Sequence, residues 1–558
     1  MPTLHWLTKP NDVKAADETP YKLLEEVPDL SAGSPDNENM IIQGDNLEAL
    51  KALLPFYAGQ VKCIYIDPPY NTGSRKNVDG TDVGYDDNLE HTIWLSMMYP
   101  RLNLLRELLA EDGLFAVQID DREFARLFLM LIDLYGEKNL KIICIKMSEA
   151  SGLKMGAIKK SGGIPKLKEY IILAKKDGIR NIRLDPVPKE KWDKEYNLYL
   201  EEFSREDKDM IDVIASKEII EDSDMEKLDA LAANLRTASL VEKARAMRIE
   251  EAQMEGWLFE NAYRICRTAA GDSVFRLTEE KKKFNKNDMF FVKSVRDECL
   301  YLVRATYSET SARPRVQVLF AEDNLKQHPG DLWTDIKTTG LDSEGGIDFK
   351  NGKKPESLLY RILLMNTQPG DLVLDSFLGS GTTAAVAHKM KLRYIGIEMG
   401  EHAKTHCAVR LQKVIEGEQG GISKVLNWQG GGGFRFYQLG VPVFTPAGRI
   451  NENVKFCNLA AHVWFAETKV AYKKQRRKSP FLGVHHDTAI ALLYNGILGD
   501  KSIGGGNVLT SKTLKTIIEN IGDREYDKMV VYGESSRIGE AKLKRLKIEF
   551  KQIPYEVK

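Results

Sequence analysis

The sequence lacks long apolar runs. In its 558 residues, no uninterrupted apolar stretch approaches the ~20 residues that a helix needs to cross a bilayer. The first residues, Met1-Pro2-Thr3-Leu4-His5-Trp6, lack the basic and apolar segments of a signal peptide. The composition, 43% apolar and 29% charged, is typical of a soluble globular protein. We therefore expect a cytoplasmic protein that makes no membrane contact.

Cysteine is scarce as well. The six cysteines are scattered without close pairs, which argues against a disulfide framework and against a zinc knuckle. His402 and His406 are four residues apart on a predicted helix, but no acidic or cysteine partner completes a recognisable ligand set. We predict no metal site.

The sequence also has no excess of positive charge. The formal net charge is −1, and because proteins that bind nucleic acid usually carry a strong positive excess, this balance argues mildly against DNA binding. Only the surface that faces the phosphates matters, however. Lysines are dense between Lys141 and Lys176, whereas acidic residues concentrate between Glu190 and Glu226. This asymmetry permits a basic groove.

Strand-like and helix-like segments alternate between residues 40 and 145. The run Val61-Lys62-Cys63-Ile64-Tyr65-Ile66 has the apolar, β-branched character of a buried parallel strand. We predict a helix from Leu102 to Leu109, a strand over 114–119, and a helix from Glu123 to Leu134 that closes at Gly136. This alternation predicts a parallel sheet flanked by helices.

The alternation stops near residue 145 and resumes at residue 355. Between these points, residues 223–255 have the alternating charges of a long exposed helix, which predicts a coiled or bridging element. After the gap we predict helix 356–365, strand 371–375, helix 381–390 and strand 393–398. Beyond residue 445 we predict a further α/β unit with strands 489–493 and 528–532 and helices 512–521 and 540–546. One α/β domain interrupted by a large insertion explains the pattern better than two separate sheets.

The motif Asp67-Pro68-Pro69-Tyr70 directly follows the first predicted strand. Open α/β sheets bind their ligands at the carboxyl ends of the strands. A carboxylate from Asp67 and the carbonyl of Pro68 would accept hydrogen bonds from an amino group on a base, and the prolines would hold these acceptors in place. Tyr70 would stack on a base swung out of the duplex. The alternative is a simple turn, since Asp-Pro is a common turn opener.

A second motif, Leu372 to Thr383, reads as a strand, a glycine-rich turn and a helix start. Its glycines would let the backbone approach a ligand closely, and the helix start would favour a carboxylate. No lysine follows the turn, which argues against a phosphate-binding P-loop. Glu398 ends the next predicted strand and would hold ribose hydroxyls. Alone, the motif fits a dinucleotide site and an adenosylmethionine site equally, and the Asp-x-Phe-x-Gly-x-Gly form favours adenosylmethionine.

These elements, in this order, resemble the β class of amino-methyltransferases. The match is closer still to the modification subunits of Type III restriction–modification systems, which the chain resembles in four segments. These are Gly44 to Leu50, Tyr65 to Gly73, Leu332-Trp333-Thr334-Asp335-Ile336 and Phe377 to Thr383.

The resemblance implies a Rossmann-like domain that binds S-adenosyl-L-methionine and methylates adenine N6 in double-stranded DNA. It implies catalytic roles for Asp67, Pro68, Pro69 and Tyr70. It implies cofactor contacts for Asp45, Lys354, Asp375, Phe377, Gly379, Gly381, Thr382 and Glu398. Cytosine N4 stays open as the target atom, although Asp at position 67 favours adenine. A nucleotide-dependent oxidoreductase is the remaining alternative, and it leaves the Asp67 motif unexplained.

The domain boundaries follow from this resemblance. They are an N-terminal segment (1–39), a methyltransferase domain in two halves (40–145 and 331–440), a target-recognition insertion (146–330) and a C-terminal α/β domain (441–558). Within the insertion, Arg264, Arg267, Arg313 and Arg315 are candidates for contacts with phosphate or guanine. We expect DNA, a second copy of the chain and a restriction subunit as partners.

Overall fold

The computed structural model describes most of the chain. The described residues are 4–34, 36–71, 74–76, 82–87, 90–148, 162–189, 191–294, 299–308, 310–347, 349, 352–473, 475, 479–499 and 506–553. They fall into two compact units, of which the first combines Met1–Leu184 with Gly330–Lys558 and the second is Asp185–Pro329. Among the described residues, no helix is long and apolar enough to span a membrane.

A ten-stranded sheet forms the centre of the first unit, as far as the described residues show, in the order β1-β20-β2-β19-β18-β3-β6-β8-β7-β17. The strands are β1 (Lys22–Glu26), β2 (Met40–Gln43), β3 (Val61–Ile66), β6 (Leu109–Ile119), β7 (Leu140–Lys146), β8 (Lys168–Ala174), β17 (Leu332–Trp333), β18 (Leu372–Asp375), β19 (Arg393–Glu398) and β20 (Arg435–Pro442). The run from β20 to β6 is parallel, whereas β1 and β8 are antiparallel to their neighbours. The predicted α/β fold with a parallel-rich sheet is confirmed.

Strands from both sides of the insertion pair directly. Val373 of β18 lies opposite Cys63 of β3, and Ile395 of β19 lies opposite Met40 of β2. The two segments that the sequence separates by the insertion therefore share one sheet.

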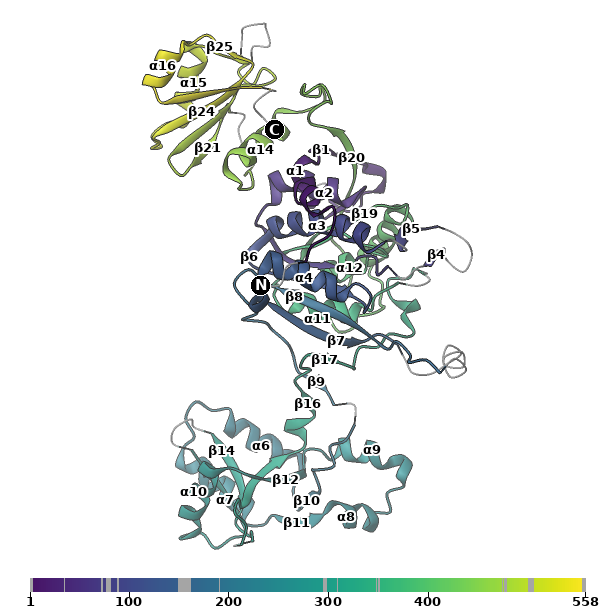
Figure 1. Cartoon of the computed structure of the whole chain (residues 1–558). Coiled ribbons are helices and arrows are strands. Elements are labelled where there is room, and N and C mark those ends of the chain that lie inside the picture. The colour runs from purple at the N-terminus through teal and green to yellow at the C-terminus, as the bar shows by residue number, and fades with distance from the viewer. Residues whose placement is uncertain are drawn as a thin grey trace. The chain divides into compact units, whose positions relative to one another are not determined.

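Helices cover both faces of this sheet (Figure 1). Alternate strand residues point to opposite faces, so Ile64 and Ile66 pack into one core while Cys63 and Tyr65 pack into the other. The first core is completed by α2 (Asn46–Tyr57), α3 (His91–Leu108) and α4 (Phe124–Tyr135). The second is completed by α11 (Glu356–Leu364), α12 (Thr382–Lys389) and α13 (Val409–Ile415).

The second unit begins later than the boundary at residue 146 that we placed from the sequence. Strand β8 is antiparallel to β6 and β7 within the main sheet, and the separate unit starts only at Asp185. The chain enters and leaves this unit through the paired strands β9 (Val187–Pro188) and β16 (Lys326–Gln327).

A six-stranded antiparallel sheet organises the described part of the second unit, in the order β11-β10-β12-β15-β14-β13. Its strands are β10 (Leu198–Glu201), β11 (Arg236–Ser239), β12 (Ile265–Ala270), β13 (Met289–Lys293), β14 (Leu300–Arg304) and β15 (Arg315–Phe320). The same unit contains helices α6 (Arg205–Ala215) and α10 (Asp272–Lys282).

The predicted long helix over 223–255 is wrong. The segment divides into α7 (Asp222–Ala232), strand β11, α8 (Leu240–Ala246) and α9 (Glu251–Glu260). Leu228, Ala232 and Leu235 are buried in the core of the unit, and β11 pairs with β10. Burial and strand pairing therefore override the local charge pattern.

The C-terminal α/β segment contains the predicted elements. Strands β21 (Phe481–His485), β22 (Thr488–Leu492), β24 (Lys528–Gly533) and β26 (Ile548–Gln552) form one sheet, in which all pairs but the first are parallel. Helices α14 (Phe456–Thr468), α15 (Ser511–Ile521) and α16 (Glu540–Arg545) belong to the same segment.

Candidate active site

Four carboxylates lie at one edge of the main sheet. Asp45, Glu398, Asp375 and Asp67 end or closely follow β2, β19, β18 and β3, which are successive parallel neighbours. This is the edge at which open α/β sheets bind ligands. The sheet order therefore brings the two sequence motifs side by side.

The Asp67 loop is anchored to the helical layer. Trp94 of α3 is fully buried, and its indole nitrogen donates a hydrogen bond of 2.8 Å to the carbonyl of Pro69. Pro68 is buried, and its ring fixes φ. The carboxylate of Asp67 is thus presented by a rigid segment.

Lys354 joins the Asp67 motif from the other side of the insertion. Its Nζ lies 3.0 Å from Oδ2 of Asp67 and 2.9 Å from the hydroxyl of Tyr70. The Tyr70 hydroxyl donates in turn to Oδ1 of Asp67. The resemblance grouped Lys354 with the cofactor residues, whereas its polar contacts are with the Asp67 motif.

Sequence reasoning missed Glu169 on β8. Because β8 runs antiparallel to β6, its first residues lie at the carboxyl end of β6, beside the Asp67 loop. Oε2 of Glu169 is 2.6 Å from the amide nitrogen of Gln118, 3.0 Å from the Tyr70 hydroxyl and 3.5 Å from Nζ of Lys354. A single carboxylate ahead of the apolar run Tyr170-Ile171-Ile172-Leu173-Ala174 was the signal that could have revealed it.

Burial and mutual charge shift the pKa values in this cluster. Burial raises the pKa of Asp67 above its usual value, and Lys354 offsets only part of that effect. Burial would lower the pKa of Lys354, but Asp67 and Glu169 outweigh it and raise the pKa. Burial would likewise raise the pKa of Glu169, but Lys354 and Gln118 hold it below the usual value. Perturbed groups at a ligand-binding edge are typical of a catalytic site.

Asp375 stabilises the glycine-rich turn through two hydrogen bonds. Its carboxylate accepts hydrogen bonds from the backbone nitrogen of Phe377 (2.9 Å) and from the hydroxyl of Thr383 (2.6 Å). Burial raises the pKa of Asp375 to about 7. Asp375 therefore shapes the turn, while Phe377 packs into the first core.

Glu398 braces the same turn from the neighbouring strand. Its carboxylate accepts from the backbone nitrogens of Gly379 (2.8 Å) and Gly400 (3.2 Å). Gly379 has φ +56°, and a Cβ there would meet only the carbonyl oxygen of Phe377 at 3.9 Å. The backbone is thus open to close approach by a ligand at this point.

Asp45 caps α2. It accepts from the backbone nitrogens of Leu47 (2.9 Å) and Glu48 (3.3 Å) and pairs with Arg101 of α3 at 2.9 Å. Asn46 donates to the carbonyl of Ser376 over 2.8 Å, which ties this cap to the glycine-rich turn. Apart from Lys354, the predicted cofactor residues therefore lie in or next to the glycine-rich turn, although Asp45 already has a structural role there.

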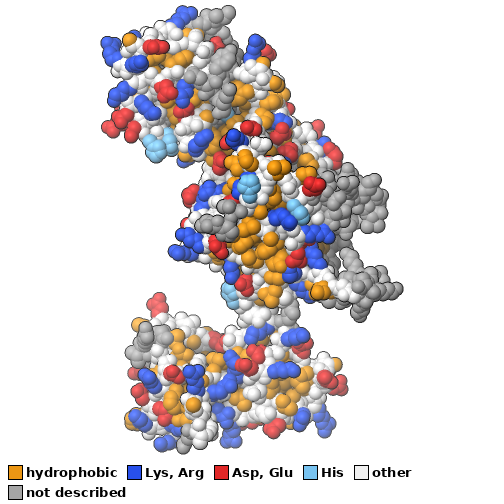
Figure 2. Space-filling view, viewed as in Figure 1, with side chains coloured by type: hydrophobic (Ala, Val, Ile, Leu, Met, Phe, Trp, Pro, Cys, Tyr) orange, Lys and Arg blue, Asp and Glu red, His pale blue; other side chains and the backbone are white. Residues whose placement is uncertain are grey.

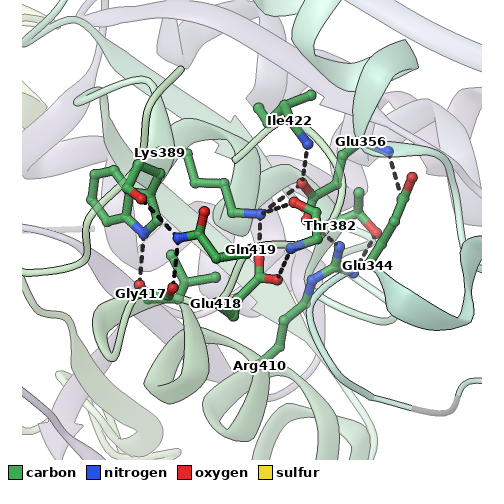
Figure 3. Close-up of polar contacts among 12 residues, drawn as sticks. Glu344, Glu356, Thr382, Lys389, Arg410, Gly417, Glu418, Gln419 and Ile422 are labelled. Atoms are coloured by element: carbon green, nitrogen blue, oxygen red, sulfur yellow. Dashed lines mark hydrogen bonds and ion pairs between the residues drawn. The ribbon is translucent and has the colours of Figure 1, made fainter. Parts of the chain in front are cut away.

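A network of buried charged side chains contacts the helix start after the glycine-rich turn through Thr382 (Figure 3). The side chains of Glu356, Lys389 and Arg410 are fully buried, and Glu356 lies 2.8 Å from Arg410 and 2.7 Å from Lys389. Arg410 also donates to the hydroxyl of Thr382 (2.7 Å), and Lys389 pairs with Glu418. Thr382, which we assigned to cofactor binding, thus directs its hydroxyl into this network.

The four arginines of the second unit differ in their surroundings. Arg264 donates to the hydroxyl of Tyr199 (2.8 Å), and Arg267 pairs with Glu195. Arg315 donates to the carbonyl of Thr268 (2.8 Å), and Arg313 is exposed. On the face seen in Figure 2, basic and acidic side chains are interspersed. Arg313 and Arg315 are exposed, whereas Arg264 and Arg267 are partly buried.

Comparison with known proteins identifies the family. A family model described as DNA methylase (N6_N4_Mtase) matches residues 61–409, more than half of the chain. The probable Type III restriction-modification enzyme HindVI Mod subunit of Haemophilus influenzae is 37% identical over 433 residues, which cover 73% of this chain and 55% of that protein. The Type III EcoPI Mod subunit of Escherichia phage P1 is 26% identical over 443 residues, covering 69% and 61%.

The chain thus spans less than two thirds of the length of these two relatives. Among solved structures, the PvuII DNA methyltransferase (cytosine-N4-specific) aligns with 67% of this chain and 86% of that one at 14% identity, with a TM-score of 0.32. From the match over residues 61–409, the chain belongs to the DNA methylase family.

Proposed function

We propose that this chain is an S-adenosyl-L-methionine-dependent DNA methyltransferase that acts on an exocyclic amino group. The observation that carries this proposal is the pairing of β3 with β18, since the Asp67 loop and the glycine-rich turn then leave adjacent strands at the same edge. A methyl acceptor and a methyl donor bound at these two sites would be neighbours. If the chain were an oxidoreductase, the cluster of Asp67, Tyr70, Lys354 and Glu169 would have no evident role in the reaction.

The residues around the turn fit the proposed cofactor. Gly379 leaves open space for close approach, α12 begins at Thr382 without a side-chain cap, and Glu398 and Asp45 offer carboxylates for hydroxyl groups. A helix start without a side-chain cap suits a carboxylate. When bound, adenosylmethionine supplies an electrophilic methyl group.

The Asp67 loop would prepare the amino group. The lone pair of an exocyclic amine is delocalised into the base, so hydrogen-bond acceptors at Asp67 and at the Pro68 carbonyl would draw the nitrogen toward a pyramidal, nucleophilic form. A preorganised acceptor of this kind is worth roughly 100-fold to 1000-fold in rate. The ring of Tyr70 would stack on the base once it has left the duplex.

We propose adenine N6 as the target atom and a Type III modification subunit as the biological role. The aspartate at position 67 supports adenine. The similarity to the HindVI and EcoPI Mod subunits supports a modification role, with double-stranded DNA as substrate. On this proposal a restriction subunit and a second copy of the chain are the expected partners.

Transfer of a tritiated methyl group from adenosylmethionine to bacterial genomic DNA that carries no adenine methylation tests the proposal. We expect label in DNA, recovered as N6-methyladenine by mass spectrometry. Label in N4-methylcytosine would overturn the adenine assignment alone. Absence of both label and cofactor binding would overturn the methyltransferase assignment.

A further inference from the structure

Three charged side chains meet at the proposed methyl-acceptor site. Lys354 contributes one positive charge and lies 3.0 Å from Asp67 and 3.5 Å from Glu169, which contribute two negative charges. All three side chains are largely buried, with 12%, 22% and 14% of their surfaces exposed. With both carboxylates ionised, the trio carries a net charge of −1.

The other charged and titratable groups facing Asp67 leave this balance in place below about pH 7. Tyr65 of β3 and Tyr70 have pKa values raised well above the usual value by burial, so both stay neutral. Asp375, at the end of the neighbouring β18, accepts two hydrogen bonds of its own, and burial raises its pKa to about 7, so it adds a negative charge only above neutral pH. Lys166 approaches the ring of Tyr70 but is paired with Asp120 at 2.6 Å.

The balance matters because methyl transfer changes the charge of the acceptor. As the bond between the amino nitrogen and the methyl carbon forms, the donor's carbon–sulfur bond breaks with its electron pair on sulfur. The nitrogen becomes cationic until it releases a proton to Asp67 or to water. A site of net −1 stabilises that charge, whereas a neutral Asp67–Lys354 pair would do so far less in a low-dielectric site.

We propose that Glu169 is a positioning residue that binds Lys354 and Tyr70 and thereby leaves the negative charge of Asp67 available to the target amine. This inference rests on the methyltransferase proposal. One oxygen, Oε2, faces the amide nitrogen of Gln118 and Nζ of Lys354, and it lies 3.0 Å from the Tyr70 hydroxyl, for whose single proton Glu169 and Asp67 compete. Glu169 thus acts through the residues that contact Asp67.

Single-turnover methyl transfer by the full chain, followed across pH with saturating adenosylmethionine and the same genomic DNA, tests this role. Glu169→Gln keeps an oxygen for the same donors but removes the charge. We expect its rate constant to fall about tenfold or more. Dissociation constants for cofactor and DNA should stay within about threefold, and Glu111→Gln, which removes an exposed carboxylate paired with Lys176, should match the unmodified chain.

The direction of the pH shift separates this role from a merely structural one. Glu169→Gln removes a negative neighbour of Asp67, so the acid limb of the profile should move to lower pH by about half a unit or more. Lys354→Met removes a positive neighbour, so its acid limb should move to higher pH. The double variant Glu169→Gln/Lys354→Met again carries net −1 and should recover part of the rate lost in Glu169→Gln.

Acid limbs that move in the same direction, or a double variant no faster than Glu169→Gln, would overturn the inference. If Glu169→Gln fails to fold, the comparison of Glu169→Gln/Lys354→Met with Lys354→Met decides, and an acid limb that is not lower in the double variant would count against the inference. Failure of the methyltransferase proposal itself is distinguishable, because the unmodified chain would then transfer no methyl group to DNA.

Discussion

Arg410 donates a hydrogen bond of 2.7 Å to the hydroxyl of Thr382, the first residue of the helix that follows the glycine-rich turn. Its other terminal nitrogen lies 2.8 Å from Glu356, two residues after Lys354. One buried arginine thus links the proposed cofactor turn to the segment that presents Lys354.

Glu356→Gln should destabilise the fold, because it leaves Lys389 and Arg410 buried with less compensating charge. We expect a loss of about 3 kcal/mol in the free energy of unfolding at pH 7, measured by urea titration. Glu519→Gln, which removes an exposed carboxylate 3.9 Å from Lys515, is the matched control and should change stability by less than about 1 kcal/mol.

The same loss should depend on pH. Burial works to raise the pKa of Glu356, but Arg410 and Lys389 outweigh it and hold the pKa below its usual value of about 4.5. The stabilisation from this carboxylate is therefore present above about pH 4.5 and is lost as the pH falls through the folded-state pKa. The difference between the parent and Glu356→Gln should shrink from pH 7 to pH 3.5. An unchanged difference at pH 3.5 would show that the charge of Glu356 is not the cause.

Gly381→Ala should weaken adenosylmethionine binding. Gly381 has φ +79°, and an added Cβ would stand 3.2 Å from Cα of Cys407, so the turn must shift. Isothermal titration calorimetry should show at least a tenfold increase in the dissociation constant. Gly59→Ala shares the backbone strain (φ +69°) but meets no atom within 4 Å, so its cofactor affinity should be unchanged. Equal effects of the two variants would contradict a specific role for the turn.

Asp67→Ala should lower the rate of methyl transfer by roughly 100-fold or more, since it removes the acceptor proposed to bind the amine. The dissociation constant for adenosylmethionine should stay within about tenfold, because the turn lies on the neighbouring strand. Asp112→Ala, which removes a carboxylate paired with Lys62 away from this cluster, should leave both quantities unchanged. A parallel loss of cofactor affinity in Asp67→Ala would show that its role is misassigned.

Replacing residues 185–329 with a short Gly/Ser linker should leave a folded chain that binds adenosylmethionine but methylates no specific DNA site. The chain enters and leaves the second unit on paired antiparallel strands, with Val187 opposite Gln327, so a short linker can join the ends. Cofactor titration and sequencing of the treated DNA measure the two outcomes. Loss of cofactor binding in a folded variant would mean that the turn needs the second unit.

The double variant Arg313→Ala/Arg315→Ala should weaken DNA binding by a similar factor whatever the DNA sequence. Removing one side chain that neutralises a phosphate makes the slope of log K against log salt shallower by about 0.9. Fluorescence anisotropy at several salt concentrations measures that slope. Arg245→Ala, also exposed and in the same unit, is the control, and a slope equal to that of the control would place the DNA-binding surface elsewhere.

Much of the fold and the two motifs could be predicted because their signals are local. Buried parallel strands such as Val61–Ile66 are short apolar runs, and glycines mark the turn before α12. The contact between Lys354 and Tyr70 could not be predicted from spacing, because 284 residues separate them and only the sheet order brings them together. Glu169 escaped notice because its position depends on β8 running antiparallel to β6.

The adjacency of β3 and β18 also sets the order in which the molecule can be assembled during translation. Roughly 300 residues separate the two strands, and at about 5–20 residues per second the ribosome needs about 15–60 s to supply the second one. Until then the backbone edge of β3 has no β18 to pair with, and an open strand edge is prone to aggregation. The intervening unit of residues 185–329 has its own core, and its synthesis is complete before that of β18. We therefore expect this unit to fold in the nascent chain before the ten-stranded sheet is complete.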